Sequence, residues 1–220
     1  MSAETDTELA AALFSLLGEP VPHDPKLEEK AENLKRQLPD TKQALLKVAE
    51  LCGEPKTAQQ FYICTKVYSW LGRQYDSKTI EYANQYLSTS GWDALPSGTK
   101  IENGITVNLS SMVRAGILVD LGGACAGSGD FQKACSAYLK AYELEPYRVN
   151  YAIEISNALI RLGRLDEAKT FLLLQKKSPF YKPVKYRDEL GIVNYNYFFR
   201  ETLDQQIENI DRRIKKLGLD

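Results

Sequence analysis

Two glycine-centred segments lie 34 residues apart, and this spacing constrains the fold more than any other feature of the sequence. Gly129-Asp130-Phe131 is matched by Gly163-Arg164-Leu165. Apolar residues at helical spacing precede and follow both segments, so each glycine is expected between two helices. A fixed period of this kind is typical of helical hairpins that stack, because one pair alone cannot bury its apolar stripe. The spacing therefore predicts an array of antiparallel helix pairs.

The residues around the first glycine follow a pattern of small, aromatic and proline positions. The matching residues are Leu118, Leu121, Gly122, Cys125, Ala134, Tyr138, Ala141 and Pro146. This pattern resembles the tetratricopeptide repeat, clearly over residues 115–180 and in a degenerate form over 58–217. The resemblance implies an all-α fold whose helix pairs form a right-handed superhelix. Small residues at Gly122 and Ala134 would let the two helices of a pair approach, with Tyr138 filling the gap between them.

The rest of the chain divides into an N-terminal extension and the repeat domain. Residues 1–55 are predicted to form extra helices, with a proline-rich linker at 19–25. These helices either pack against the first repeat unit or fold back over the binding surface. Residues 56–220 are predicted to form the tetratricopeptide-like domain, with an insertion at 91–108 and a capping helix at 200–218.

The insertion is longer than the connections within helical repeats, and long connections tend to carry function or to be disordered. Asn103-Gly104 lies between β-favouring residues, which is the signal of a tight hairpin. We therefore expect a small β-hairpin near 99–108, and a disordered loop is the alternative. Trp92 in the same insertion is a candidate anchor for a partner.

An apolar stripe runs along the predicted C-terminal helix at alternating spacings of four and three residues. Its members are Leu203, Ile207, Ile210, Ile214 and Leu217. The stripe is too short for an independent coiled coil. It predicts a helix that caps the last repeat and shows its charged side to water. Formation of a homodimer through the same stripe is the alternative.

Charge and hydropathy exclude several classes of partner. The 28 Lys and Arg residues balance 29 Asp and Glu residues. Because no charge excess attracts phosphates or anionic lipid, we expect neither nucleic acid nor a membrane as partner. No apolar run approaches the roughly 18 residues that a membrane span needs. The first 25 residues carry five acidic side chains and no Lys or Arg, unlike a secretory signal, so we expect a cytoplasmic protein.

The residue types that carry most catalysis and metal binding are few and poorly placed. The single histidine, His23, lies in the proline-rich linker, where little packing is available to position a base. The four cysteines form no CxxC pair and are expected to be buried thiols. The glycine-rich run from Leu121 to Gly129 lacks the Gly-Lys-Ser/Thr of a phosphate-binding loop. We expect no enzyme activity, no metal and no cofactor.

The resemblance also implies where a ligand binds, because tetratricopeptide proteins hold extended peptides along the concave face made by their first helices. Carried onto the matching positions, the predicted peptide-binding residues are Tyr62, Lys66, Asn150, Glu154, Asn157, Arg161, Arg187 and Asn194. Chaperone-binding members of the family carry a cation where this chain has Glu154, so recognition of a terminal carboxylate is not expected. Asparagines can donate and accept hydrogen bonds toward a peptide backbone, and arginines can pair acidic ligand side chains. The alternative is that this polar strip is only hydrated.

These observations favour a non-enzymatic adaptor, scaffold or chaperone that binds a protein or peptide in the concave face. The alternative function is a structural or regulatory homo-oligomer that assembles through its C-terminal or N-terminal helices. The sequence does not identify the partner.

Overall fold

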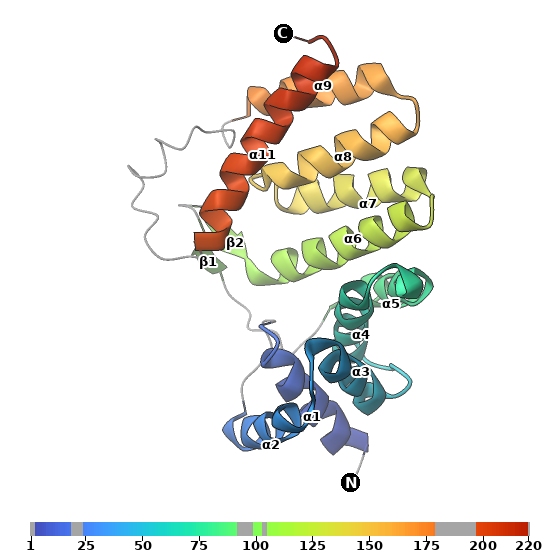
Figure 1. Ribbon diagram of the computed structural model, residues 1–220, viewed down its shortest axis with the longest axis vertical. Helices are drawn as coiled ribbons and strands as arrows, with labels where there is room; N and C mark the ends of the chain where they lie inside the picture. The colour runs from blue at the N-terminus through green and yellow to red at the C-terminus, as the bar shows by residue number, and fades with distance from the viewer. Residues whose placement is uncertain (1–2, 19–23, 92–98, 103–104, 179–196, 220) are drawn as a thin grey trace. The chain divides into compact units, whose positions relative to one another are not determined.

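The structure, a computed structural model, describes residues 3–18, 24–91, 99–102, 105–178 and 197–219. The chain divides into two compact units, Met1–Ser97 and Gly98–Asp220. Helices account for nearly all of the described residues, so the predicted all-α fold is confirmed (Figure 1).

The first unit is a succession of short helices. They are α1 (Ala3–Ser15), α2 (Pro25–Gln37), α3 (Thr41–Cys52), α4 (Ala58–Leu71), the 3-10 helix η1 (Arg73–Tyr75) and α5 (Asp76–Ser88). Asp24, Asp40 and Thr57 accept hydrogen bonds from backbone N–H groups at the starts of α2, α3 and α4. Such caps satisfy donors that the first turn of a helix leaves unpaired. Helix α1 contacts α2, α3 and α4, so the N-terminal helices pack against the α4–α5 pair.

The boundary between the two units differs from the predicted domain boundary at residue 56. Helices α4 and α5 belong to the same unit as α1, α2 and α3. Aromatic packing explains this grouping, because the ring of Phe14 on α1 lies 6.2 Å from that of Tyr62 and 6.0 Å from that of Trp70 on α4. The ring of Tyr62 in turn lies 5.9 Å from that of Tyr86 on α5. The assignment of 56–220 to a single repeat domain stays a prediction.

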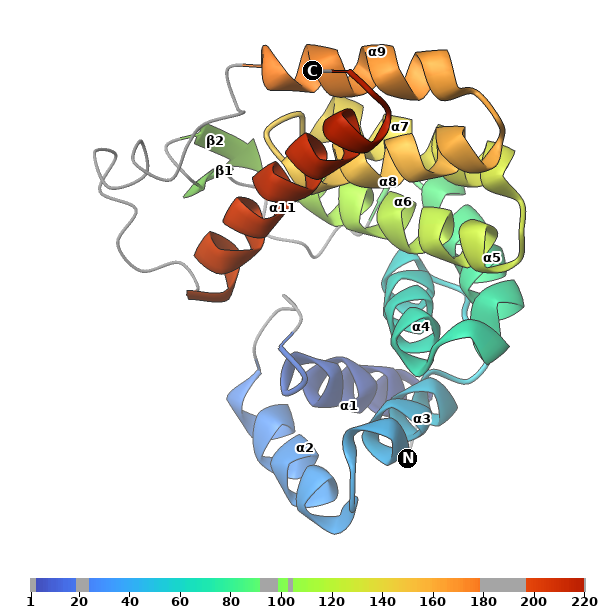
Figure 2. The same ribbon diagram turned by 45° about the horizontal axis from the view of Figure 1, so that its top comes forward.

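The second unit combines a hairpin with a row of helices, each packed on the next. Its elements are β1 (Thr99–Glu102), β2 (Ile105–Asn108), α6 (Leu109–Gly127), α7 (Phe131–Leu144), α8 (Val149–Arg161), α9 (Leu165–Lys176) and α11 (Tyr197–Lys216). Helix α6 packs on α7, α7 on α8, and α8 on α9, while α11 contacts α8 and α9. Figure 2 shows the same row from a second direction, with α11 lying across α8.

The hairpin lies where Asn103-Gly104 predicts it. Strands β1 and β2 pair antiparallel, with Thr99 opposite Asn108 and Glu102 opposite Ile105. The Asn108 side chain also accepts hydrogen bonds from the N–H groups of Ser110 and Ser111, so the residue that ends the hairpin caps α6.

Gly129 and Gly163 end α6 and α8 in the same way. Their φ angles are 85° and 74°, in the left-handed region that glycine adopts without strain. In both places the glycine N–H donates to the carbonyl three residues earlier at 3.1 Å, and the next N–H donates to the carbonyl five residues before it at 2.9 Å. These hydrogen bonds define a Schellman motif. The identical caps make α6–α7 and α8–α9 equivalent hairpins, as the 34-residue spacing predicts.

Within the first of these hairpins, Tyr138 of α7 lies across Gly122 of α6. A Cβ atom on Gly122 would lie 2.5 to 2.8 Å from three carbons of the Tyr138 ring. Ala134 and Ala141, on the same face of α7 as Tyr138, are fully buried. Small side chains beside one large ring allow close approach of the two helices, because the ring fills the space that the missing side chains leave.

Helix α11 closes the row, which confirms the predicted capping helix. The buried cluster beneath it comprises Ala152, Ile153, Leu172, Ile210 and Ile214. Lys176 of α9 and Asp211 of α11 form an ion pair at 2.6 Å beside this cluster. Part of the predicted apolar stripe therefore faces α8 and α9.

We expect Gly122→Ala to lower the free energy of unfolding by about 1–3 kcal/mol, because the added methyl group would force the buried Tyr138 ring to move. Gly116→Ala in the same helix is the matched control, since a Cβ there meets no atom within 4 Å. Alanine is favoured over glycine inside a helix by about 0.5–1 kcal/mol, so this control should be neutral or stabilising. Urea unfolding followed by circular dichroism measures both. Equal effects of the two alanines would contradict the packing role of Gly122.

Candidate functional site

The predicted peptide-binding residues of α8 share one side of that helix. Asn150, Glu154 and Asn157 are half-buried and lie three or four residues apart, which places them on one face. In the preceding hairpin, the positions equivalent to Glu154 and Asn157 are Asp120 and Gly123 of α6, each 34 residues earlier. Asp120 is half-buried and Gly123 is exposed. We call Asp120, Gly123, Glu154 and Asn157 the first-helix surface.

The hydroxyl of Tyr138 reaches this surface from α7. It lies 3.9 Å from the position that a Cβ on Gly123 would take. Burial raises the pKa of Tyr138, and the Glu154 carboxylate, the Cys125 thiol and the Asp120 carboxylate raise it further. The hydroxyl therefore stays protonated and lies near two carboxylates, one from each hairpin. This arrangement suits a ligand that offers hydrogen-bond donors and disfavours one that brings a negative charge.

Arg161 is exposed, but its guanidinium group is already engaged. It lies over the ring of Phe131, 4.8 Å from the ring centroid. Arginine over an aromatic face is a favourable cation–π contact. The end of α8 is thereby tied to the start of α7, a structural role that the prediction of Arg161 as a ligand contact did not include.

The predicted contacts on α4 have different environments. Tyr62 is only 3% exposed, since Phe14 and Tyr86 cover its ring. The prediction of Tyr62 as a peptide contact is therefore wrong: helix α1 occupies the face of α4 that would have to be open. Lys66 is half-buried on the same helix.

Three further predicted residues lie outside the described part of the chain. They are Arg187, Asn194 and the candidate anchor Trp92. Their roles stay predictions.

A buried hydrogen-bond network in the turn between α7 and α8 positions α8. The carboxylate of Glu145, 1% exposed, accepts hydrogen bonds from the Tyr147 hydroxyl at 2.5 Å, the Tyr151 hydroxyl at 2.7 Å and Arg148 Nε at 2.9 Å. Burial and the Glu145 carboxylate raise the pKa of Tyr151, which keeps its hydroxyl a donor. A buried carboxylate with three donors resists displacement. The start of α8, and with it Asn150, is fixed by this turn.

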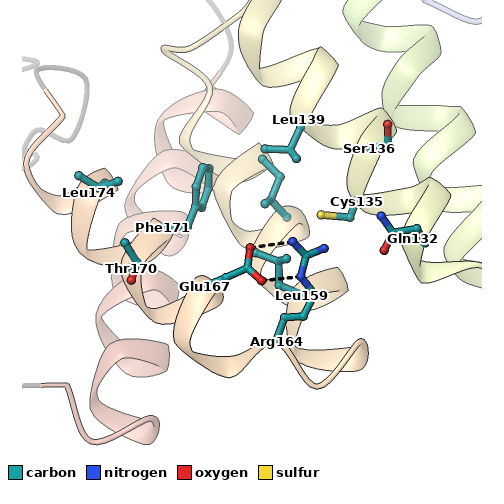
Figure 3. A pocket seen from close by; sticks show the side chains of 11 residues that line it. Gln132, Cys135, Ser136, Leu139, Leu159, Arg164, Glu167, Thr170, Phe171 and Leu174 are labelled. Atoms are coloured by element: carbon teal, nitrogen blue, oxygen red, sulfur yellow. Dashed lines mark hydrogen bonds and ion pairs between the residues drawn. The ribbon is translucent and has the colours of Figure 1, made fainter.

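The structure also contains a groove that the sequence analysis missed. It lies between α7 and α9, over α8, and has a volume of about 500 Å³ (Figure 3). Leu139 on one wall and Leu174 on the other are exposed. The sequence signal that could have indicated the groove is the presence of these two leucines at helix positions that face water.

The described residues offer little for metal or membrane chemistry. In the parts of the chain that the structure describes, no three His, Cys, Asp or Glu side chains lie close enough together to hold a metal ion. Among those same parts, no helix is both long and apolar enough to cross a bilayer. All four cysteines are buried thiols, as predicted. A hydrogen bond with Cys64 is the main cause of the raised pKa of the Cys52 thiol, and burial raises this pKa further. The thiol is therefore not activated as a nucleophile.

Comparison with known protein families matches residues 115–148 to the tetratricopeptide repeat. The matched segment contains most of α6, all of α7 and the turn before α8. No curated protein matches the chain. The chain therefore contains a tetratricopeptide repeat, a kind of helical unit that in general serves protein interaction.

We expect Glu145→Ala to lower the free energy of unfolding by about 3–5 kcal/mol, since it leaves the largely buried Arg148 without its carboxylate partner. Glu145→Gln keeps a hydrogen-bond acceptor, so it should lower the free energy of unfolding by less than Glu145→Ala does. Glu143→Ala is the matched control on an exposed neighbour and should change the stability by no more than about 0.5 kcal/mol. Urea unfolding measures all three, and similar losses from Glu145→Ala and Glu143→Ala would show that the network does not hold the turn.

We expect stability to fall at alkaline pH, and Tyr138→Phe to weaken that dependence. The pKa of Tyr138 is raised in the folded state. Its protonated hydroxyl therefore contributes fully to the free energy of unfolding at any pH below the pKa of an unfolded tyrosine, about 10. Above that pH the unfolded chain loses a proton that the folded chain keeps, which costs about 1.4 kcal/mol per pH unit until the folded pKa is reached. Urea unfolding at pH values from 9 upward measures how steeply the free energy of unfolding falls with pH in wild type and in the variant. Tyrosinate absorbance is the second readout. Identical slopes in wild type and variant would contradict the raised pKa.

Proposed function

We propose that this protein is a non-enzymatic adaptor, scaffold or chaperone that binds a segment of a protein partner across α6 and α8. The observation that carries the proposal is the tetratricopeptide repeat at 115–148. The α8–α9 hairpin follows it with the same glycine cap, which extends the array by one unit. Because the helices of such an array are ordered before the ligand arrives, the ligand bears most of the loss of conformational freedom on binding.

The first-helix surface supports a particular kind of ligand. Asn157 can donate and accept hydrogen bonds at once, which matches the alternating groups of an extended backbone. Gly123 has no side chain, so a ligand backbone can approach α6 closely there. Asp120 and Glu154 would repel a terminal carboxylate. We infer an internal, extended segment as ligand. The cytoplasmic location stays a prediction.

Site-specific photo-crosslinking tests this proposal. A photoreactive amino acid at Asn157 in the full chain should cross-link a defined set of proteins in a lysate of the source cells. The same amino acid at Lys133, an exposed residue of α7, is the control. Glu154→Arg should remove the cross-links formed at position 157, because it replaces a carboxylate of the surface with a bulky cation. Cross-linking that is equal at 157 and 133, or unchanged by Glu154→Arg, would show that the first-helix surface does not bind the partner.

A further inference from the structure

The groove between α7 and α9 lies along the second helices of the two hairpins. Ile155 and Leu159 of α8, both almost fully buried, form its floor. The first-helix surface uses Glu154 and Asn157 of the same helix, residues that do not line the groove. The groove is therefore a separate site, and the inference drawn from it does not depend on the function proposed above.

Contacts at one end of the groove join its two walls, and an ion pair at the other end orders one wall. At one end the Tyr142 hydroxyl of α7 and the Gln175 amide of α9 form a hydrogen bond of 2.9 Å. The ring of Tyr142 also meets that of Phe171 edge-on, with 5.7 Å between centroids. At the other end Arg164, the residue before α9, donates two hydrogen bonds of 2.6 Å each to Glu167 of α9, drawn as dashed lines in Figure 3. The Tyr142 contacts thus fix the spacing of the two walls at their end of the groove, as in other preformed recognition pockets.

The lining of the groove has no net charge. Arg164 and Glu167 are its only charged residues, and they neutralise each other. Burial raises the pKa of the Cys135 thiol, so this thiol stays protonated. The remaining polar groups are hydroxyls and an amide. An ionised side chain of a ligand would lose its hydration in the groove without gaining an ionic partner there. The groove therefore favours ligand side chains that are uncharged and apolar.

The rim and the length of the groove define the shape of its occupant. Leu139 and Leu174 are 37% and 58% exposed on opposite walls. Exposed leucines gathered at the rim of one apolar groove are typical of a docking surface, whereas leucines scattered singly over a surface are not. From Gln132 to Leu139 the wall spans eight residues of α7, or about 10 Å. Two turns of a helix fit this length.

The charges beside the rim complement an acidic partner. Lys140 follows Leu139, and Lys177 lies three residues after Leu174. Both lysines are exposed, and neither has an ion pair within the described ranges of the chain. Glu143 is the one exposed carboxylate among the described residues at this end of α7. Because this end of the groove carries two exposed cations and one exposed anion, it favours a partner segment that carries carboxylates.

We propose that this groove binds an amphipathic helix of a partner protein, which places two apolar side chains one turn apart between α7 and α9 and acidic residues beside Lys140 and Lys177. This is the helix-in-groove mode of recognition, with the anchors at i and i+3 or i+4.

A designed peptide tests the proposal on the full chain. The probe is a fluorescent synthetic helix of about 15 residues made of Ala, Gln, Glu and Leu, with Leu at i, i+3, i+4 and i+7 and Glu on both flanks. Fluorescence anisotropy should show saturable binding. Leu174→Gln and Leu139→Gln should each raise the Kd about tenfold, the loss expected when one buried leucine contact is removed.

Matched controls make the test specific. Leu165→Gln changes a leucine that is 49% exposed on α9 but does not line the groove, and it should leave the Kd unchanged. Asn157→Ala, on the first-helix surface, should also leave it unchanged. A probe with Lys in place of Glu should bind more weakly. Absence of saturable binding would overturn the proposal, and so would equal effects of Leu165→Gln and Leu174→Gln on the Kd. Loss of binding in Asn157→Ala, or equal affinity of the Lys and Glu probes, would also overturn it. Circular dichroism confirms that each variant folds.

Discussion

The contact between Tyr138 and Gly122 determines how the second unit presents its side chains. A helix turns by about 100° per residue, so the position of one ring decides where its neighbours face. With the Tyr138 ring against Gly122, its hydroxyl emerges beside Gly123 on the first-helix surface. Cys135 and Leu139 are then turned by about 60° and 100° around α7 from Tyr138, toward the groove between α7 and α9. One close approach of two helices thus specifies both candidate binding sites.

The two sites differ in chemistry although they share a helix. Glu154 and Asn157 of α8 belong to the polar first-helix surface, whereas Ile155 and Leu159 form the floor of the apolar groove. The alternation follows from helical geometry, since residues one apart on α8 point to different sides. Both sites therefore depend on the same placement of α8, and the buried Glu145 network fixes that placement.

Features encoded by short stretches of sequence were predictable. Gly129 and Gly163 identify the helix ends because only a few residue types adopt a positive φ there. Asn103-Gly104 identifies the hairpin for a similar reason, since a two-residue turn restricts the residues that can form it. In each case the information lies within a few neighbouring residues.

Features that depend on distant segments were not predictable in this way. Phe14 buries Tyr62 across 48 residues of chain, and no local pattern shows that α1 packs there. Arg161 likewise meets Phe131 only because α8 ends beside the start of α7. The groove arises from the spacing of α7 and α9, helices that are not consecutive. The repeat positions predicted residues that share one face of α8, whose role in binding stays a prediction, and the prediction failed at Tyr62, where α1 competes for the same face.

The position of α11 bears on the alternative of a homo-oligomer. Ile210 and Ile214 are 0% and 1% exposed against α8 and α9. An apolar side chain that is buried within its own chain cannot also pack against a second copy, because the same surface cannot be removed from water twice. Self-assembly through these residues would require α11 to leave the last hairpin and expose Leu172 and Ile153 to water, an unfavourable change that the new interface would have to offset. The apolar stripe is thus better explained as the end of the repeat array, while assembly through the N-terminal helices stays a prediction.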